Sequence, residues 1–482
     1  MKARIAVVLA FCMIVPLISR SEQTSPPIPA PPRPVNVPQP AEKTLANGLR
    51  VIVVPKSGLP LVAVRLMIMT GGEADPADRA GLADMTASLL TKGTATRSAE
   101  EIARDVEALG ATIDSGAAWD NSFVALSALA SNFPEAMGYV ADVVLHPTFT
   151  TEEINRLRDQ NIDALQVALR QPQSLAGFVT SRVLYRGSPY GHSLGGTPKS
   201  LSAIARPDIV AFHSKYYRPG NAVLVVAGDV APAAMFSLAG KLFGSWQSGS
   251  VPAVPQAGSA PPATAEPRVV VVDLPDAGQA AVVVALRGMR RVDPQYNAAL
   301  VANAVLGGGY SSRLNQEIRI KRGLSYGAGS AFDFRRMPGP FVASAQTKNE
   351  SAAEVATIIL DELKKMTATA VPGTELTPRK AILIGNFGRS LETTSGLVGR
   401  IAQLALYGLN LTEINNYIHD VEAVTPADVQ AFAAHHLLPN QATVVIVGDS
   451  TKFLDALRQK FANVEVIPID KLDLDSATLK KP

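Results

Sequence analysis

The 482-residue sequence predicts an α+β protein made of two similar halves. Three observations support this fold class. The chain is longer than one typical domain, a long segment of it recurs, and β-rich runs alternate with helical stretches. Each half is therefore expected to hold a mainly antiparallel sheet with helices packed on one face.

The recurring segment covers residues 212–229 and returns in outline over residues 432–449. A proline, a glycine and an aspartate fall in register in both copies, and the two aspartates, Asp229 and Asp449, are 220 residues apart. Solenoid repeats have periods of roughly 20 to 50 residues. A repeat this long therefore indicates a duplicated domain.

Elements within the halves follow from local composition. Valine- and isoleucine-rich runs predict strands over residues 50–54 and 268–272, and helical patterns predict helices over 99–109 and 351–366. A stretch rich in proline, alanine, glycine and serine predicts a linker between the halves. The predicted boundaries are 42–246 for the first domain, 247–267 for the linker, 268–468 for the second domain and 469–482 for a tail.

The N-terminus has the order of residues typical of a secretory signal peptide. Lys2 and Arg4 precede an apolar stretch over residues 5–18, which is short for a membrane span. We predict a signal peptide over residues 1–22 and a proline-rich tether over 23–41. The protein is then exported, to the periplasm if the source is a Gram-negative bacterium. Because Cys12 is the only cysteine, the mature protein would have no disulfide and no thiolate ligand.

Composition excludes some classes of function. The formal net charge is only +3, whereas a nucleic-acid-binding protein is expected to carry a concentrated basic stripe. The apolar fraction of 47% is ample for two real cores. The sequence therefore predicts an ordinary globular protein with no nucleic-acid partner.

Residues 81–94 read Gly-Leu-Ala-Asp-Met-Thr-Ala-Ser-Leu-Leu-Thr-Lys-Gly-Thr. The segment resembles the active-site helix of the pitrilysin or insulinase family of zinc peptidases (family M16). Members of that family read roughly G-L-A-H-x-x-E-H followed by a K-G-T turn. The two histidines, four apart, bind the metal, and the glutamate activates water. Asp84, Ala87 and Ser88 stand at those three positions here, so the resemblance implies a degenerate zinc site.

Other interpretations of this helix remain. Its small and apolar residues would also suit an ordinary amphipathic core helix. A residual metal site would rest on Asp84 and Ser88, with Asp163 nearest to the family's third ligand, and zinc prefers imidazole and thiolate to such donors. We therefore predict no metal site in this chain.

The second part of the family signature is intact. Residues 311–326 read Ser-Ser-Arg-Leu-Asn-Gln-Glu-Ile-Arg-Ile-Lys-Arg-Gly-Leu-Ser-Tyr, and they include Arg319 and, seven positions later, Tyr326. The resemblance implies that this pair holds the substrate carbonyl. A permanently charged guanidinium and a phenolic donor suit an oxygen that gains negative charge. The alternative is a surface arginine in a basic helix and an ordinary strand tyrosine.

The resemblance covers residues from about 45 to 465 and implies two halves that face each other as a clamshell. It favours a non-catalytic subunit that supplies Arg319 and Tyr326 to a partner chain bearing H-x-x-E-H. Zinc is then expected in the partner, and no cofactor in this chain. The alternative is a peptide-binding or scaffolding protein without a role in proteolysis, which would hold extended segments at a sheet edge. A self-sufficient zinc peptidase is disfavoured, because both imidazoles and the general base are missing.

Overall fold

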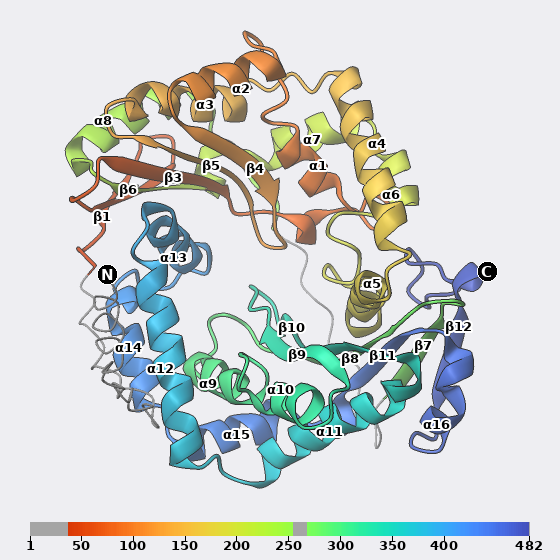
Figure 1. Ribbon diagram of the computed structural model, residues 1–482. Coiled ribbons are helices and arrows are strands. Elements are labelled where there is room, and N and C mark those ends of the chain that lie inside the picture. Colours follow the sequence, from red (N-terminus) through yellow and green to blue (C-terminus); the bar gives the residue numbers. More distant parts are fainter. Residues whose placement is uncertain (1–36, 254–267, 482) are drawn as a thin grey trace, which may run out of the picture. The chain divides into compact units, whose positions relative to one another are not determined.

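The computed structural model describes residues 37–253 and 268–481 (Figure 1), and these all fall within one compact unit, Val35–Pro482. The predicted signal peptide, most of the tether and residues 254–267 of the predicted linker lie outside the described residues. None of the helices in the part of the chain that the structure describes has the length and apolarity needed to cross a membrane.

The first half contains a six-stranded sheet with the order β1-β2-β6-β3-β5-β4. All neighbouring strands are antiparallel except β2 and β6, which run parallel. The predicted strand at residues 50–54 is β2. The bounds are β1 (Ala41–Thr44), β2 (Arg50–Pro55), β3 (Leu61–Ile68), β4 (Thr112–Ala117), β5 (Ser122–Leu129) and β6 (Ala222–Gly228).

The second half repeats this order as β12-β7-β11-β8-β10-β9. Strand β7 runs parallel to both β11 and β12, and the remaining pairs are antiparallel. The two sheets differ at one edge, where β1 is antiparallel to its neighbour and β12 is parallel to its own. The bounds are β7 (Arg268–Asp273), β8 (Ala280–Arg287), β9 (Ser325–Phe332), β10 (Pro340–Thr347), β11 (Thr443–Gly448) and β12 (Val464–Pro468).

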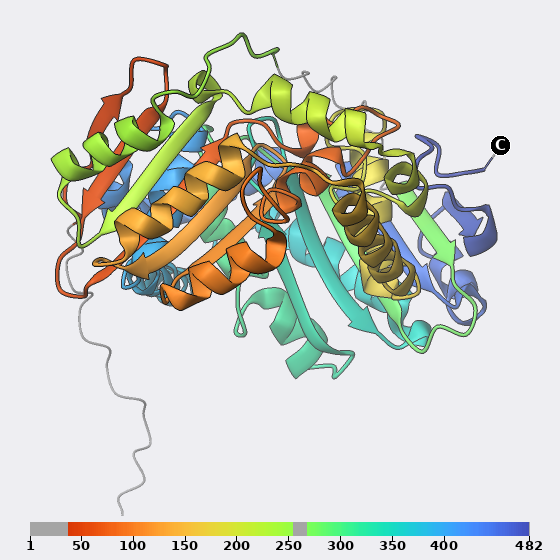
Figure 2. The ribbon, with the colours of Figure 1, turned by 90° about the horizontal axis from the view of Figure 1, so that it is seen from above.

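Each half places most of its own helices on one face of its sheet, as predicted. Figure 2 shows α2 and α3 lying along one face of the first sheet. In the first half the helices are α1 (Leu82–Ser88), α2 (Ala99–Ala108), α3 (Phe133–Leu145), α4 (Thr151–Ala168), α5 (Pro172–Tyr185), α6 (Pro198–Ala203), α7 (Arg206–Tyr216) and α8 (Pro232–Phe243).

In the second half the helices are α9 (Tyr296–Leu306), α10 (Arg313–Asn315), α11 (Ala352–Ala368), α12 (Gly373–Ser390), α13 (Thr394–Leu406), α14 (Glu413–Ala423), α15 (Pro426–His436) and α16 (Leu454–Arg458). The helices predicted at 99–109 and 351–366 are α2 and α11. The repeat detected in the sequence covers α7 and β6 in the first half and α15 and β11 in the second.

The remaining face of each sheet is covered by a helix from the other half. Leu397 and Ile401 of α13 pack in one core with strand residues of the first sheet, such as Ile52. In return, α5 packs its apolar side chains against the second sheet. Figure 1 shows α13 beside β3 and β6, and α5 beside β8 and β11. The two halves therefore complete each other's cores.

This exchange explains the unbroken apolar runs in β2 and β8. Residues 51–54 and 280–286 are buried without alternation, which is typical of strands covered on both faces. The two exchanged helices also occupy equivalent places in the repeat, since Tyr185 at the end of α5 and Tyr407 just after α13 are 222 residues apart. The exchange is therefore symmetrical.

Both ends of the described chain pack on the opposite half. Val37, which falls in the predicted tether, is buried and its N–H donates to Asn415 Oδ1 of α14 at 2.9 Å. Within the predicted tail, Asp475 accepts a hydrogen bond from Thr197 Oγ1 at 2.9 Å, and Arg182 Nε donates to the carbonyl of Leu474. These contacts add to the exchanged helices in joining the halves.

Candidate functional site

Helix α1 begins at a turn that its own sequence defines. Gly81 has φ of 92°, a left-handed conformation that favours glycine. Asp75 accepts hydrogen bonds from the N–H groups of Gly81 and Ala83, both at 2.8 Å, and so satisfies the first turn of the helix. The opposite face of α1 buries Leu82 and Met85 in the core of the first half.

Helix α1 carries the three residues predicted to replace the zinc ligands and base. Asp84 accepts a hydrogen bond from the N–H of Ala117 at 3.4 Å, and burial raises the pKa of its carboxyl. Ala87 is completely buried and Ser88 is half-buried. An aspartate biased toward its neutral form, a methyl group and a hydroxyl do not fit the donor set that zinc prefers.

No third ligand compensates for this deficit in the described chain. Asp163, the residue nearest to the family's third ligand, is exposed on α4. Among the residues that the structure describes, no group of three or more histidine, cysteine, aspartate or glutamate side chains is placed to hold a metal ion. The structure therefore gives no support to a residual zinc site at Asp84 and Ser88.

Arg319 and Tyr326 lie on two elements of the second half that contact each other. Arg319 is half-buried on a π-helical turn, Gln316–Ile320, which continues directly from α10. Tyr326 lies on β9, at the edge of the second sheet, and is 91% exposed. Within the described residues, no hydrogen bond or ion pair connects this turn or β9 to α1, so the two parts of the family signature stand on separate halves.

The cations next to Arg319 in the sequence form ion pairs, whereas Arg319 does not form one within the described residues. Arg313 forms an ion pair with Glu375 at 2.7 Å, and Lys321 and Arg322 both bind Glu317. Arg319 has no ion pair or hydrogen bond to its side chain among the described residues. Its guanidinium carbon instead lies 5.0 Å from the centre of the Tyr310 ring. Arg319 is therefore the cation of this segment that keeps its donors available.

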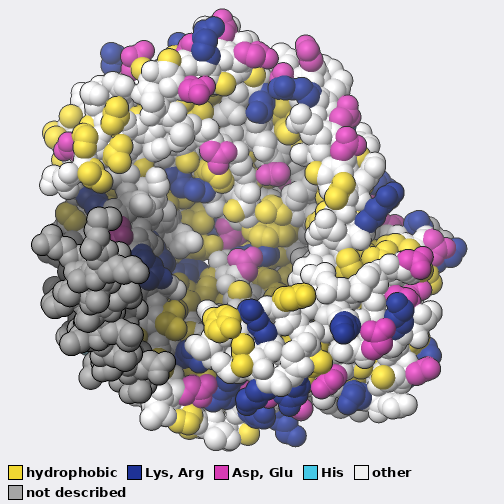
Figure 3. Space-filling view, in the orientation of Figure 1, with side chains coloured by type: hydrophobic (Ala, Val, Ile, Leu, Met, Phe, Trp, Pro, Cys, Tyr) yellow, Lys and Arg dark blue, Asp and Glu magenta, His cyan; other side chains and the backbone are white. Residues whose placement is uncertain are grey.

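Figure 3 shows apolar and basic side chains side by side on the surface over α9, α10 and β9. The exposed apolar side chains of this region are Tyr310, Ile320 and Tyr326. Together with Arg319 they form a surface that combines a positive charge with aromatic groups, which we call the Arg-Tyr surface. Its chemistry suits a peptide backbone with a polarised carbonyl oxygen.

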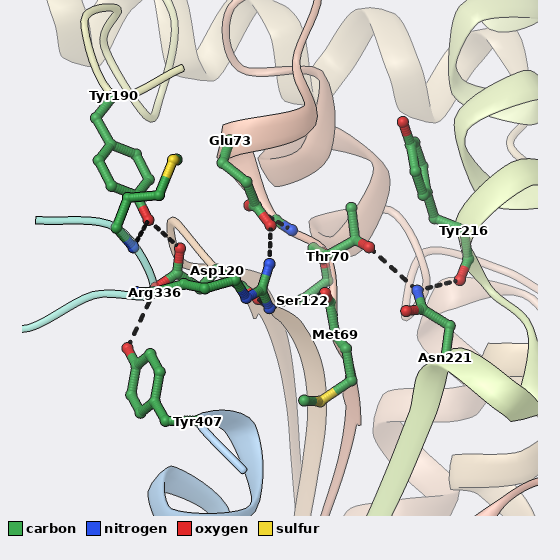
Figure 4. A network of polar contacts seen from close by, with 12 residues as sticks. Met69, Thr70, Glu73, Asp120, Ser122, Tyr190, Tyr216, Asn221, Arg336 and Tyr407 are labelled. Carbon is green, nitrogen blue, oxygen red and sulfur yellow. Dashed lines mark hydrogen bonds and ion pairs between the residues drawn. The ribbon is translucent and has the colours of Figure 1, made fainter. Parts of the chain in front are cut away.

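A second polar cluster, which the sequence did not predict, lies where the halves meet (Figure 4). Arg336 donates to Glu73 Oε1 at 2.9 Å and to the carbonyl oxygens of Met69 and Asp120 at 3.0 and 3.1 Å. Arg336 belongs to the second half and its acceptors belong to the first. Arg336 therefore links the two halves within this cluster.

The carboxylate of Asp120 is the other centre of this junction cluster. It accepts hydrogen bonds from Tyr190, from the N–H of Arg336 at 2.7 Å and from Tyr407 at 3.3 Å. Burial raises the pKa of Glu73 to about 8, and the negative charge of Asp120 adds to this effect while Arg336 opposes it. Burial therefore biases the Glu73 carboxyl beside Arg336 toward its neutral form.

A sequence signal for this cluster was present but ambiguous. Tyr190 falls in the segment Pro-Tyr-Gly-His that resembles the family, and Tyr407 follows the helix equivalent to α5. Neither position shows which half it will contact. The contacts follow from the exchange of α5 and α13, which only the tertiary structure reveals.

Comparison with known proteins identifies the family. The model of the insulinase family of peptidases, family M16, matches residues 50–198, and the model of the peptidase M16 inactive domain matches residues 203–383. The chain belongs to peptidase family M16. The prediction of this family from the two sequence segments is therefore confirmed.

Solved structures of M16 proteins share the fold of this M16 chain. A peptidase M16 inactive domain from Pseudomonas fluorescens is 27% identical, with a TM-score of 0.80 over 85% of this chain and 98% of that one. A protease from Helicobacter pylori, 22% identical with a TM-score of 0.79 over 86% of this chain and 100% of that one, supports the fold alone. The prediction of two α+β halves is confirmed.

Relatives of similar length are named as peptidases. An uncharacterized zinc protease of Mycobacterium tuberculosis (strain ATCC 25618 / H37Rv) is 29% identical over 85% of this M16 chain and 93% of the relative. An uncharacterized zinc protease of Streptomyces coelicolor is 25% identical over 84% of this chain and 88% of that relative. These names describe the relatives. In this chain, Asp84, Ala87 and Ser88 remain the residues at the predicted motif positions.

Proposed function

We propose that this M16 protein is a non-catalytic subunit of an exported zinc metallopeptidase. In this proposal it pairs with an M16 chain that carries H-x-x-E-H and supplies Arg319 and Tyr326 to the active site of that partner. The partner would hold the zinc ion, and this chain would need no cofactor of its own.

The observation that carries the proposal is the state of Arg319. The neighbouring cations Arg313, Lys321 and Arg322 are each paired with a glutamate, whereas Arg319 has no acidic partner among the described residues. An arginine without an acidic partner in the described chain, on a turn that contacts the strand of the exposed Tyr326, suits a substrate-binding role.

Helix α1 also supports the proposal, because it lacks the groups that a partner chain would have to supply. Its three motif positions carry no imidazole and no exposed base. The carboxyl of Asp84 already accepts a hydrogen bond from the N–H of Ala117. A chain of this kind keeps the donors for the substrate oxygen but not the groups that activate water. The complementary groups would have to come from a second chain.

The chemistry of the pair is electrostatic. Peptide hydrolysis builds negative charge on the former carbonyl oxygen, and preorganised donors stabilise that charge more than they stabilise the substrate. Arg319 can donate from a charged fork, and the exposed phenol of Tyr326 can donate a second hydrogen bond. Removal of one such donor typically lowers kcat about 100- to 1000-fold.

The test is cleavage of a quenched-fluorescent peptide library by the mature protein, alone and mixed with an H-x-x-E-H homologue from the same organism. We expect strong cleavage only in the mixture, and loss of that stimulation with Arg319→Ala. The matched control is Arg322→Ala, which removes an exposed arginine already bound to Glu317. Stimulation that does not depend on Arg319 would refute the proposal.

A second candidate is a peptide-binding or scaffolding protein without a role in proteolysis. It is favoured by one observation, namely that β4 and β9 are edge strands in their sheets. An edge strand has unpaired backbone groups that an extended peptide can bind. This function predicts that the chain alone binds unfolded peptides, with an affinity that is unchanged in Arg319→Ala and Tyr326→Phe.

A further inference from the structure

The loop that precedes Arg319 is fixed against β9. The carbonyl of Gly307 accepts a hydrogen bond from the N–H of Ser330 at 3.0 Å. A Cβ atom added to Gly307 would lie 2.3 Å from that nitrogen, so only glycine allows this approach. The loop is therefore held close to the strand that carries Tyr326.

Two further side chains fix the position of Tyr310 in this loop. Asn315, which is buried, donates from Nδ2 to the carbonyl of Tyr310 at 2.5 Å, and its Oδ1 accepts from the N–H of Ala328 at 3.3 Å. Arg379, which is also buried, donates to both the hydroxyl and the carbonyl of Ser311. The backbone at Tyr310 is therefore anchored on both sides.

The side chain of Tyr310 is exposed although its backbone is anchored. It is 66% exposed, and its ring centre lies 5.0 Å from the guanidinium carbon of Arg319. This distance lies within the range of a cation-π contact. The ring is the contact partner of the Arg319 guanidinium within the described residues, since hydrogen bonds and ion pairs to that group are absent there.

We infer that Tyr310 is a positioning residue for Arg319. Its ring face restricts the guanidinium to one orientation while leaving the N–H donors free for a substrate oxygen. A carboxylate partner would also position the arginine, but it would neutralise the charge and occupy the donors. An aromatic face avoids both effects. This inference rests on the proposed function, because it assigns Tyr310 a role in the same reaction.

The inference predicts a specific kinetic effect. A mispositioned donor weakens stabilisation of the transition state more than binding of the substrate. In the mixture with the H-x-x-E-H homologue, Tyr310→Leu should lower kcat about fivefold, as expected for the loss of one exposed cation-π contact and its ordering effect. KM should change by less than about twofold. Tyr310→Phe keeps the ring and should restore kcat.

The matched control is Ile382→Ala, which removes an exposed apolar side chain of α12 that lies outside the Arg-Tyr surface. We expect it to leave kcat and KM unchanged. A fall in kcat with both Tyr310→Phe and Tyr310→Leu, or with neither, would overturn the inference.

A second measurement does not depend on activity. In arginine-labelled protein, the Nε–Hε signal of Arg319 can be identified by its loss in Arg319→Lys. A ring above the guanidinium shifts the Hε signal to lower frequency. We expect Tyr310→Leu to remove that shift and Tyr310→Phe to keep it, and an unchanged signal in Tyr310→Leu would overturn the inference.

The two measurements together separate this inference from the proposed function. If the mixture depends on Arg319 but not on Tyr310, the inference fails and the proposed function stands. If the activity of the mixture does not depend on Arg319, the proposed function fails and the role of Tyr310 in the reaction fails with it, whatever the Nε–Hε signal shows.

Discussion

The two halves of this protein have the same strand order but differ in the exposure and hydrogen bonding of the polar residues that match the family signature. In the first half, Asp84 on α1 is half-buried and accepts a backbone hydrogen bond, and burial raises the pKa of its carboxyl. In the second half, Tyr326 is exposed and Arg319 lacks an acidic partner among the described residues. A duplicated fold therefore preserves the scaffold more strictly than the chemistry, because packing depends on apolar pattern and chemistry on a few single positions.

The largest expected effect tests the second half. Arg319→Ala should lower kcat/KM of the mixture with an H-x-x-E-H homologue by about 100- to 1000-fold, since one preorganised donor is worth about 3 to 4 kcal/mol in the transition state. Steady-state kinetics measure the loss. Arg319→Lys should recover only part of it, because an ammonium lacks the planar fork. An unchanged melting temperature would show that the loss is not due to unfolding.

The next effect concerns the junction between the halves. The pKa of Glu73 is raised from 4.5 to about 8 in the folded protein. The stabilisation from its protonated form is therefore fully present below pH of about 4.5 and is lost as the pH rises toward about 8. The free energy of unfolding should therefore fall as the pH rises through this window.

Glu73→Gln removes this titration and should flatten the dependence of stability on pH over that window. Denaturant unfolding at a series of pH values measures it. The variant leaves the other members of the cluster unchanged, which are Asp120, Arg336, Tyr190 and Tyr407. The control is Glu135→Gln on the exposed surface of α3. Equal slopes for the wild type and Glu73→Gln would contradict this assignment.

A smaller effect tests the symmetry of the exchanged helices. Ile401 of α13 and Leu175 of α5 are both fully buried against the sheet of the other half. Substitution of either by alanine should reduce the free energy of unfolding by about 3 kcal/mol, through lost burial and a cavity. Gln403→Ala, an exposed change on α13, should alter it by less than about 0.5 kcal/mol.

The exchange also predicts one cooperative transition, because each core contains side chains from both halves. Urea unfolding followed by fluorescence and by circular dichroism should give coincident curves for the wild type and both variants. Two separated transitions would show that the halves unfold independently.

The smallest expected effect tests the first half. Asp84→Asn keeps an acceptor for the N–H of Ala117 and removes a carboxyl that burial already biases toward its neutral form. The activity of the mixture should therefore change by less than about twofold. Purified wild-type protein should also contain far less than one zinc ion per chain by elemental analysis. One zinc ion per chain in the wild type, lost in Asp84→Asn, would contradict the prediction that the first half has no metal site.

The sequence alone determined the duplicated α+β architecture, the strands at β2 and β7, the helices at α2 and α11, and the family. These features depend on local composition and on a repeat, and both can be recognised from the order of residues alone. The sequence also predicted that Asp84, Ala87 and Ser88 share one helix, and that Arg319 and Tyr326 belong to one segment of the second half. Short separations in the chain made these placements predictable.

Only the tertiary structure decided which sheet each of the helices α5 and α13 covers. Nothing in α5 or α13 shows that their apolar faces belong to the opposite sheet, because burial is not directional and either sheet would accept them. The junction of Glu73, Asp120 and Arg336 joins residues more than 200 positions apart. The sequence also could not show that Arg319 lacks an acidic partner among the described residues, since this depends on which glutamates its neighbours reach in three dimensions.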